Sequence, residues 1–170
     1  TLIYIHSGKK IMSISPKFKL PIAILVCVLV GSLSGYATAD SINSWYSTLQ
    51  KPFFNPPNWI FGPVWTVLYI LMGISAGLVW KADVASSIKQ KALLVFGLQL
   101  VVNAAWSLIF FGLQQPLLAF VDILLLLGLI NYTIKLFKPI HKTASTLLIP
   151  YLLWVSFATI LNLSIWMLNG

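Results

Sequence analysis

The chain has 170 residues, of which 59% are hydrophobic and 8% are charged, whereas about a quarter of the residues of a soluble domain carry charge. A small water-soluble fold cannot hide this much apolar side chain, because its surface is large relative to its volume, so the composition excludes a soluble protein and predicts one domain in lipid. The net charge of +8 comes from 11 lysines and three aspartates; without arginine, the usual residue for bidentate contacts to guanine or phosphate, no nucleic-acid partner is expected.

Residues 1–19 form a polar tail with four lysines, in which Met12 is a candidate start of the native protein. Five apolar segments follow, each near the roughly 20 residues needed to cross hydrocarbon. Their expected bounds are 20–39, about 60–80, about 90–111, about 117–137 and about 144–168. Only helices or closed barrels satisfy their backbone in lipid, and runs this long exclude barrel strands. The expected fold class is an all-α integral membrane protein, with a single five-helix transmembrane domain over residues 20–168.

The lysines fall almost entirely on one side of such a bundle. With five crossings, the N-terminal tail, the second loop and the fourth loop share a side that holds ten lysines, and the other side holds only Lys51. The positive-inside rule therefore predicts a cytoplasmic N-terminus and an external C-terminus.

The first loop, residues 45–57, is rich in proline and aromatic residues. Proline fixes φ and stiffens a connection, and tryptophan prefers the membrane interface. Two interpretations remain open: an aromatic belt on a rigid connector, or a lid over a cavity.

Large aromatic and amide side chains recur on single faces of three predicted helices. They are Phe61, Trp65 and Tyr69 in the second, Gln99, Asn103, Trp106, Ser107 and Phe110 in the third, and Trp154, Ala158 and Asn162 in the fifth. Amide side chains are costly when they face lipid, so Gln99, Asn103 and Asn162 are expected to point into the bundle. A hydrogen bond between helices suffices to explain any one amide, but three helices that present amides and tryptophans together favour a ligand pocket.

Asp122 is the only acidic residue deep within a predicted span. Acidic residues are costly in hydrocarbon and are candidates for function. Asp122 follows Pro116 by six residues, or about 9 Å of helix, a depth at which the cost is smaller. Two interpretations remain open: a structural hydrogen bond to a neighbouring helix, and a role toward a ligand or a proton. Pro150 is expected to kink the fifth helix.

The residues of known metal and catalytic sites do not occur in suitable patterns. One cysteine, Cys27, and two distant histidines, His6 and His141, predict neither a disulfide nor a zinc site. Phosphate-binding glycine loops, serine–histidine pairs and paired carboxylates are also missing from the sequence. No metal, no required cofactor and no firm catalytic residue are expected.

Several motifs resemble the TspO/MBR family of tryptophan-rich sensory or translocator proteins. The first is Trp45-Tyr46 followed by Leu49-x-Lys51-Pro52, Pro56-Pro57-x-Trp59 and Gly62-Pro63-Val64-Trp65-x-x-Leu68-Tyr69. Later ones are Gln99-Leu100-x-x-Asn103-x-x-Trp106-Ser107, Val121-Asp122, and Pro150-Tyr151-Leu152-x-Trp154-x-x-Phe157-Ala158-x-x-Leu161-Asn162. The resemblance covers roughly residues 20–168 and draws on four helices.

The resemblance implies a five-helix bundle, commonly a homodimer, that binds porphyrins, sterols and benzodiazepine-type compounds. The implied pocket walls are Phe61, Trp65, Tyr69, Asn103, Trp106, Ser107, Trp154 and Ala158, to which the stripes above add Asn162. The animal members' cholesterol pattern requires a tyrosine and a basic residue, where this chain has Leu163 and Met167. A bacterial-type protein of the cell membrane that takes a porphyrin is therefore expected.

Three functions remain in competition. In the first, the protein is a receptor or sensor in which a tetrapyrrole stacks on Trp65 and Trp154, with amides at its polar edge and Lys51 near a propionate. Gln99 and Asp122 are secondary candidates. In the second, Trp65 and Trp154 carry out light-dependent oxidative breakdown of the porphyrin, as the resemblance implies. The third is transport, which is disfavoured because no ion-coupling site or inverted repeat is evident.

Overall fold

The structure, a computed structural model, describes residues 15–170. The expectations for the N-terminal tail before Ser15, including Met12 as a start, fall outside the described residues. The helices, in chain order, are α1 (Pro16–Asn43), α2 (Trp45–Thr48), α3 (Asn58–Lys81), α4 (Ser86–Ser107), the π-helix η1 (Leu108–Gly112), α5 (Pro116–Phe137), α6 (Lys142–Leu147) and α7 (Ile149–Asn169). This part of the chain contains no strand, which confirms the all-α fold class.

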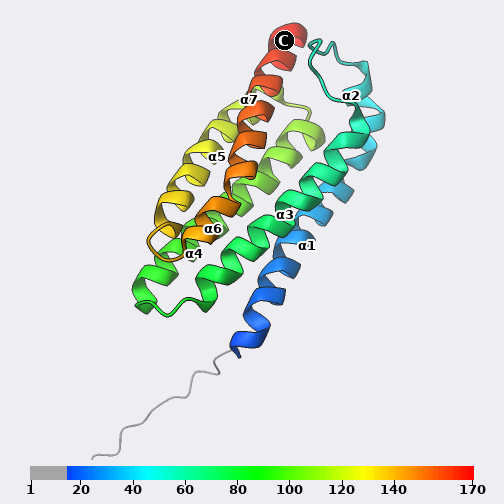
Figure 1. The fold of residues 1–170 in the computed structure, drawn as a ribbon. Helices are drawn as coiled ribbons and strands as arrows, with labels where there is room; N and C mark the ends of the chain where they lie inside the picture. Colours follow the sequence, from blue (N-terminus) through cyan, green and yellow to red (C-terminus); the bar gives the residue numbers. More distant parts are fainter. Residues whose placement is uncertain (1–14) are drawn as a thin grey trace, which may run out of the picture.

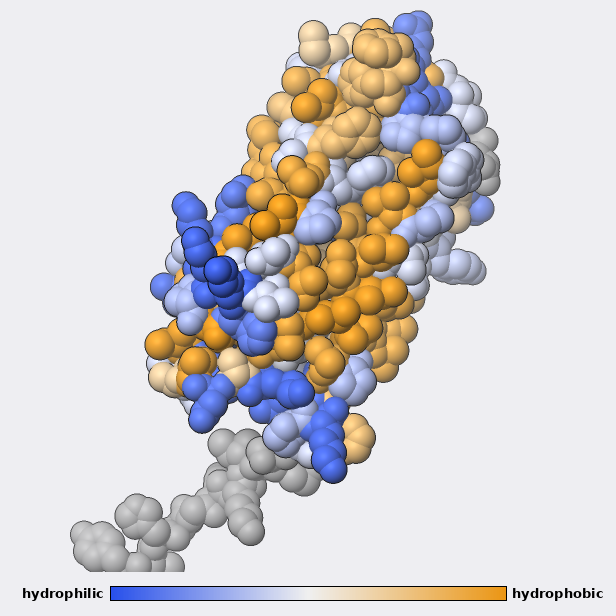
Figure 2. All heavy atoms as spheres, viewed as in Figure 1, coloured by the Kyte–Doolittle hydropathy of each residue, from blue (hydrophilic) through white to orange (hydrophobic). Residues whose placement is uncertain are grey.

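Five stretches of the described chain are long and apolar enough to cross a membrane. Three of them are α1, α3 and α5, the fourth is α4 continued by η1, and the fifth is α6 together with α7. Most of the observed spans extend one to four residues beyond the expected bounds, and α5 ends at Phe137 as expected. Figure 2 shows hydrophobic residues over the middle of the visible face and hydrophilic ones mainly toward its ends.

The helices form one elongated bundle (Figure 1). Helix α1 packs chiefly along α3, while α5 packs against both α4 and α7. The α3–α4 and α5–α6 connections lie at the end of the bundle where α1 begins. Helix α2 and the C-terminus lie together at the opposite end, which we call the lid end.

The fifth span is divided into two helices near the predicted kink. Helix α6 ends at Leu147, and α7 begins at Ile149 with Pro150 in its first turn. Proline has no backbone N–H to donate and is tolerated at this position. Ser75 of α3 donates a hydrogen bond of 2.7 Å to the Ala144 carbonyl of α6, so the short helix is fastened to its neighbour.

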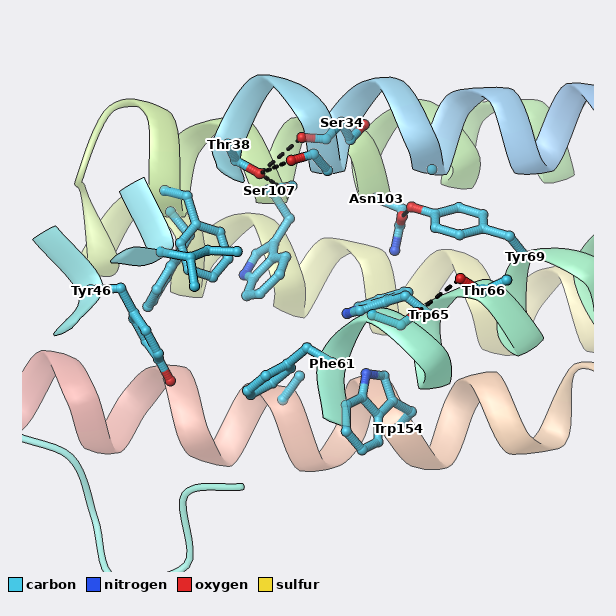
Figure 3. A pocket seen from close by; sticks show the side chains of 18 of the residues that line it. Ser34, Thr38, Tyr46, Phe61, Trp65, Thr66, Tyr69, Asn103, Ser107 and Trp154 are labelled. Carbon is cyan, nitrogen blue, oxygen red and sulfur yellow. Dashed lines mark hydrogen bonds between the residues drawn. The ribbon is translucent and has the colours of Figure 1, made fainter. Parts of the chain in front are cut away.

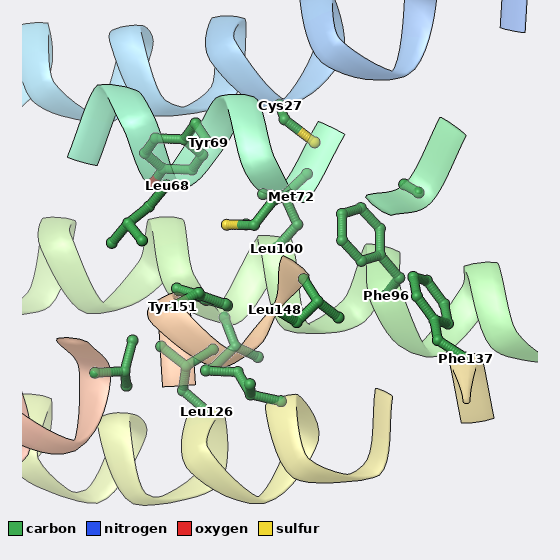
Figure 4. Packing of buried hydrophobic residues seen from close by; sticks show 14 of the residues in the cluster. Cys27, Leu68, Tyr69, Met72, Phe96, Leu100, Leu126, Phe137, Leu148 and Tyr151 are labelled. Carbon is green, nitrogen blue, oxygen red and sulfur yellow. The ribbon is translucent and has the colours of Figure 1, made fainter. Parts of the chain in front are cut away.

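The larger of two buried apolar clusters lies mostly in the half of the bundle away from the lid end, and Figure 4 shows part of it. Met72 is fully buried there, and the rings of Phe96 and Phe137 stack 5.8 Å apart. The smaller cluster lies at the lid end and joins α2, η1, α5 and α7 through Tyr46, Phe110, Ala119, Leu161 and Ile165. The bundle is thus packed solidly at both ends.

Two glycines of α3 let α1 approach very closely. A Cβ at Gly77 would lie 2.9 Å from the Leu20 Cα, and one at Gly73 would collide with the Ile24 backbone. Gly31 of α1 similarly leaves room for the ring of Tyr69. Small residues on membrane helices permit close packing, and these three glycines hold α1 to α3 in this way, whereas a Cβ at Gly35 would meet no atom within 4 Å.

We expect Gly73→Ala to lower the free energy of unfolding by about 1–3 kcal/mol, because a methyl group would have to push the α1 backbone away. Gly97→Ala is the matched control, since a Cβ at Gly97 meets no atom within 4 Å. The control should be neutral or stabilising by up to about 1 kcal/mol through helix propensity. Thermal unfolding in detergent measures both. Equal effects of the two substitutions would contradict the close contact.

Candidate functional site

A cavity of about 480 Å³ lies between the two apolar clusters. This volume is in the range of about 300–1,000 Å³ that small-molecule sites occupy. Its walls come from α1, α2, α3, α4, η1 and α7 (Figure 3). The lining residues are Val28, Gly31, Ser32, Ser34, Gly35, Tyr36, Thr38, Ile42, Tyr46, Asn58, Phe61, Gly62, Trp65, Thr66, Tyr69, Asn103, Trp106, Ser107, Phe110, Phe111, Trp154, Ala158, Leu161, Asn162 and Ile165.

Helix α3 and helix α7 supply one aromatic wall. Phe61, Trp65 and Tyr69 are spaced four residues apart, so they project from one face of α3. The Trp65 and Tyr69 rings lie 5.7 Å apart at 33°, and Phe61 meets Trp154 of α7 edge-on at 6.0 Å. These contacts fix flat apolar surfaces around the cavity.

The π-helix η1 supplies a second aromatic wall. Its wider turn is closed by the Leu113 N–H, which donates to the Leu108 carbonyl at 2.8 Å. Phe110 stacks on Trp106 at 5.5 Å, and Phe111 meets Phe110 edge-on at 4.8 Å. Single π turns inside helices are frequent at functional sites, and this one adjoins the cavity.

Asn162 of α7 has both ends of its amide engaged by the protein. Its Oδ1 accepts from the Trp106 indole at 3.0 Å, and its Nδ2 donates to the Pro116 carbonyl at 2.8 Å. The side chain is 1% exposed. Although Asn162 lines the cavity, its amide therefore orients Trp106 and joins α7 to the first turn of α5.

Asn103 of α4 differs because half of its amide is unused. Its Oδ1 accepts from the Tyr69 hydroxyl, whereas its buried Nδ2 has no hydrogen-bond partner among the described residues. The same is true of the Trp154 indole nitrogen. Figure 3 shows the Asn103 nitrogen turned away from Tyr69 and the Trp154 nitrogen turned toward Trp65. Two residues of the cavity wall thus carry unsatisfied donors that are themselves buried, and an acceptor on a ligand that reaches them would satisfy them.

The wall that α1 provides was missed by the sequence analysis. Thr38 is 2% exposed; its hydroxyl donates to the Ser34 carbonyl at 2.9 Å and lies 3.4 Å from the Ser107 hydroxyl of α4. Gly31, Ser34, Thr38 and Ile42 recur every three or four residues and share one face of α1. This run of mostly small residues on one helix face was the signal available in the sequence.

The first loop covers the lid end of the cavity, as the lid interpretation predicts. Tyr46 of α2 is 3% exposed, lines the cavity and donates to the Asn55 side-chain oxygen at 2.7 Å. Burial raises the pKa of Tyr46 to about 12, and the hydrogen bond with Asn55 opposes part of the rise. The neutral phenol is therefore the form that holds the lid.

A further contact ties the lid to the end of α7. The Gln50 N–H donates to the Asn169 Oδ1 at 2.8 Å, and the Asn169 Nδ2 donates to the Gln50 carbonyl at 2.9 Å. The same Nδ2 also donates to the Ile165 carbonyl at 2.8 Å. One asparagine side chain thereby satisfies both backbone groups of a loop residue, and we call this contact the latch.

The structure brings together nine of the twelve predicted site residues and leaves three elsewhere. The nine that line the cavity are Phe61, Trp65, Tyr69, Asn103, Trp106, Ser107, Trp154, Ala158 and Asn162. Lys51 is in the lid, where its ammonium lies 4.8 Å from the Tyr46 ring centre and donates to the Leu49 carbonyl.

The other two lie outside the cavity lining. Gln99 is buried and accepts from the Tyr151 hydroxyl at 2.8 Å. Asp122 is half-buried on α5, and its Oδ2 has no hydrogen-bond partner in residues 15–170. These positions give Gln99 a structural contact and leave the two interpretations of Asp122 open.

Fold and cavity together define an integral membrane protein with an internal site of ligand size. The profile of the TspO/MBR family matches residues 23–167. A tryptophan-rich protein TspO of Archaeoglobus fulgidus is 44% identical over 153 residues, 89% of this chain and 97% of that protein. One of Chlorobaculum tepidum is 42% identical over 150 residues, with 88% and 95% covered. The translocator protein of Homo sapiens is 43% identical over 125 residues, with 72% and 73% covered. The chain belongs to the TspO/MBR family.

We expect the lid to weaken in alkali through Tyr46. Because its pKa is raised in the folded state, the stabilisation it provides is complete below about pH 10 and is lost as the pH rises through about 12. The thermal unfolding temperatures of wild type and Tyr46→Phe should therefore converge in this pH range, since phenylalanine keeps the ring but cannot ionise. A difference between the two proteins that stays constant with pH would contradict the assignment.

Proposed function

We propose that the protein is a membrane receptor or sensor that binds porphyrins, or similarly flat apolar molecules, in the cavity between its helices. The observation that carries the proposal is the pair of unpartnered donors, Asn103 Nδ2 and Trp154 Nε1, in a buried aromatic site. Leaving a buried donor unsatisfied costs about 1–3 kcal/mol. A ligand that brings an acceptor to this point recovers that energy on binding.

The chemistry of a porphyrin matches these walls. Its ring offers two large flat faces to Trp65, Trp106 and Trp154, and its carboxylate side chains offer acceptors to the amide and indole donors. None of the cavity-lining residues in the described chain is His, Cys, Asp or Glu. The ring and its acceptors, rather than a coordinated metal, would therefore supply the affinity, and no further cofactor is required.

Membership of the TspO/MBR family supports the same function, because the resemblance of the site motifs implies a tetrapyrrole ligand. It also supports a homodimer as the assembled form.

The bundle gathers Lys81, Lys89, Lys135 and Lys142 at or near the end where α1 begins, opposite the lid. By the positive-inside rule we propose that this end faces the cytoplasm and that the lid and C-terminus face outward.

We expect Asn103→Leu to weaken binding of protoporphyrin IX about ten- to a hundredfold, because the deleted donor is worth about 1–3 kcal/mol in a buried site. Quenching of tryptophan fluorescence in detergent gives the dissociation constant. Asn131→Leu is the matched control, since Asn131 is an exposed amide of α5 that bonds only within its own helix.

Tyr69→Phe separates ligand binding from stability. It removes the hydroxyl that bonds to the Asn103 Oδ1 but leaves the Asn103 Nδ2 free for the ligand. It should therefore lower thermal stability while most of the affinity remains. Equal affinity in wild type and Asn103→Leu would overturn the proposed recognition.

A second candidate function, light-dependent oxidation of the bound porphyrin, is favoured by one further observation. Trp65 and Trp154 both line the cavity, and Trp65 is in ring contact with Tyr69 and Tyr151. An indole next to an excited porphyrin can donate one electron to the ring, and dioxygen dissolved in the membrane would be the terminal oxidant that net oxidation of the ring requires. Any such activity would be added to binding, because the same side chains hold the ring.

We expect Trp65→Phe and Trp154→Phe to abolish light-driven bleaching of protoporphyrin IX. Affinity should change less than about tenfold in Trp65→Phe, since phenylalanine keeps most of the apolar contact. It should fall about ten- to a hundredfold in Trp154→Phe, which also deletes the Nε1 donor, so bleaching is compared at saturating porphyrin. Absorbance at the porphyrin band under illumination measures bleaching. Trp80→Phe, at the opposite end of α3, is the control and should bleach like wild type. Unchanged bleaching in both cavity variants would assign the reaction to free pigment.

A further inference from the structure

The exposed residues of the cavity wall are confined to two helices. Among the described lining residues, those that are also exposed at the protein surface all belong to α1 or α3, and none belongs to α4, η1 or α7. They are Ser32, Gly35, Tyr36, Asn58, Gly62 and Thr66. The cavity therefore opens sideways, between α1 and α3, in the half of the bundle nearer the lid.

The opening begins where the close packing of α1 and α3 stops. The two helices are in backbone contact at Gly73, and the Tyr69 ring fills the space beside Gly31. One turn further along α1, at Gly35, and about two turns beyond Tyr69 on α3, at Gly62, a Cβ would meet no atom within 4 Å. Small residues at these two positions keep the space between the helices empty of side chains.

The rim of this opening is suited to the passage of an apolar ligand. Leu33 is 67% exposed and Val67 is 55% exposed, so the surface next to the opening faces hydrocarbon. The Thr66 hydroxyl donates to the Gly62 carbonyl at 2.9 Å and is satisfied within its own helix. A flat ring could pass this rim without giving up solvation by lipid.

The end of the cavity that faces water is closed. Tyr46 is buried against the rings of Phe110 and Phe111, and the latch between Asn169 and Gln50 holds the loop that follows α2. Entry by this route would break two hydrogen bonds and expose part of the apolar cluster at the lid end.

From these four observations we propose that the gap between α1 and α3 is a lateral portal, and that the ligand enters from the lid-side half of the bilayer rather than from water. The occupant is a flat apolar molecule already dissolved in lipid. The proposal rests on the proposed ligand site, since it describes how that site is filled.

The test uses the full chain in phosphatidylcholine vesicles, with protoporphyrin IX as the probe and stopped-flow quenching of tryptophan fluorescence as the readout. Gly35→Leu and Gly62→Leu put a side chain into the portal. Gly128→Leu on α5 is the matched control, since a Cβ there also meets nothing within 4 Å and Gly128 lies outside the cavity. Asn169→Ala opens the latch.

We expect the two portal variants to slow both association and dissociation about tenfold, because an obstructed path hinders movement in both directions. Gly35 and Gly62 also line the cavity, so the test is the slowing of both rates together and not the dissociation constant. Gly128→Leu and Asn169→Ala should exchange porphyrin at the wild-type rate. Gly35→Ala should fall between wild type and Gly35→Leu.

Three outcomes would overturn the portal. They are wild-type rates in both leucine variants, dissociation that becomes faster in them, and exchange that becomes faster in Asn169→Ala alone. The last would assign entry to the lid. In each case equilibrium binding by wild type still supports the proposed function, whereas a wild-type protein that binds no porphyrin at equilibrium overturns both proposals.

Discussion

The close approach of α1 and α3 at Gly73 and Gly77 sets the shape of the rest of the molecule. Lipid supplies no hydrophobic force between helices, so they associate through close packing and hydrogen bonds. Helix α1 has no other extensive partner than α3, and its tight contact lies in the half away from the lid. Nearer the lid end, Gly35 of α1 and Gly62 of α3 line the cavity, and a Cβ at either would meet no atom within 4 Å. The glycines of this helix pair have two different roles. Gly73 and Gly77 allow the two backbones to come into contact, whereas Gly35 and Gly62 leave open space beside them.

The second constraint is the polarity of the buried amides. Gln99, Asn103 and Asn162 are all at most 2% exposed, yet their surroundings differ. Asn162 is satisfied at both ends by Trp106 and Pro116. Asn103 is satisfied at one end only, by Tyr69. Gln99 also has a nitrogen without a partner among the described residues, but it lies outside the cavity lining. An amide whose groups are all bonded stabilises the walls, and a free donor can meet a ligand only where it adjoins the cavity, as at Asn103. The difference lies in which neighbours each amide meets, and the helical spacing of the amides does not reveal it.

Much of the fold and site could be predicted from the sequence, for reasons that also explain the misses. Five long apolar runs allow only helices in lipid, and the spacing of four between Phe61, Trp65 and Tyr69 placed them on one face. The wall from α1 was not predicted because Ser34 and Thr38 are small, and small residues in a membrane helix are read as packing positions. Lys51 was expected near the ligand because it is the only cation of its side. Its place beside Tyr46 depends on the fold of the loop, which local sequence does not determine.

The position of the cavity between two apolar clusters, which meet at Trp106, gives the site a property that neither cluster has alone. The larger cluster holds the half with the tight helix contact, and the smaller one holds the lid against η1 and α7. The cavity lies between them and is bordered on one side by a gap rather than by packed side chains. A ligand can therefore enter or leave without disturbing the contacts on which the fold depends. In a bundle with one continuous core, the same exchange would require local unfolding, which costs a large part of the total stability. Dividing the core is thus the structural condition for a site that is dry, rigid and still accessible from the membrane.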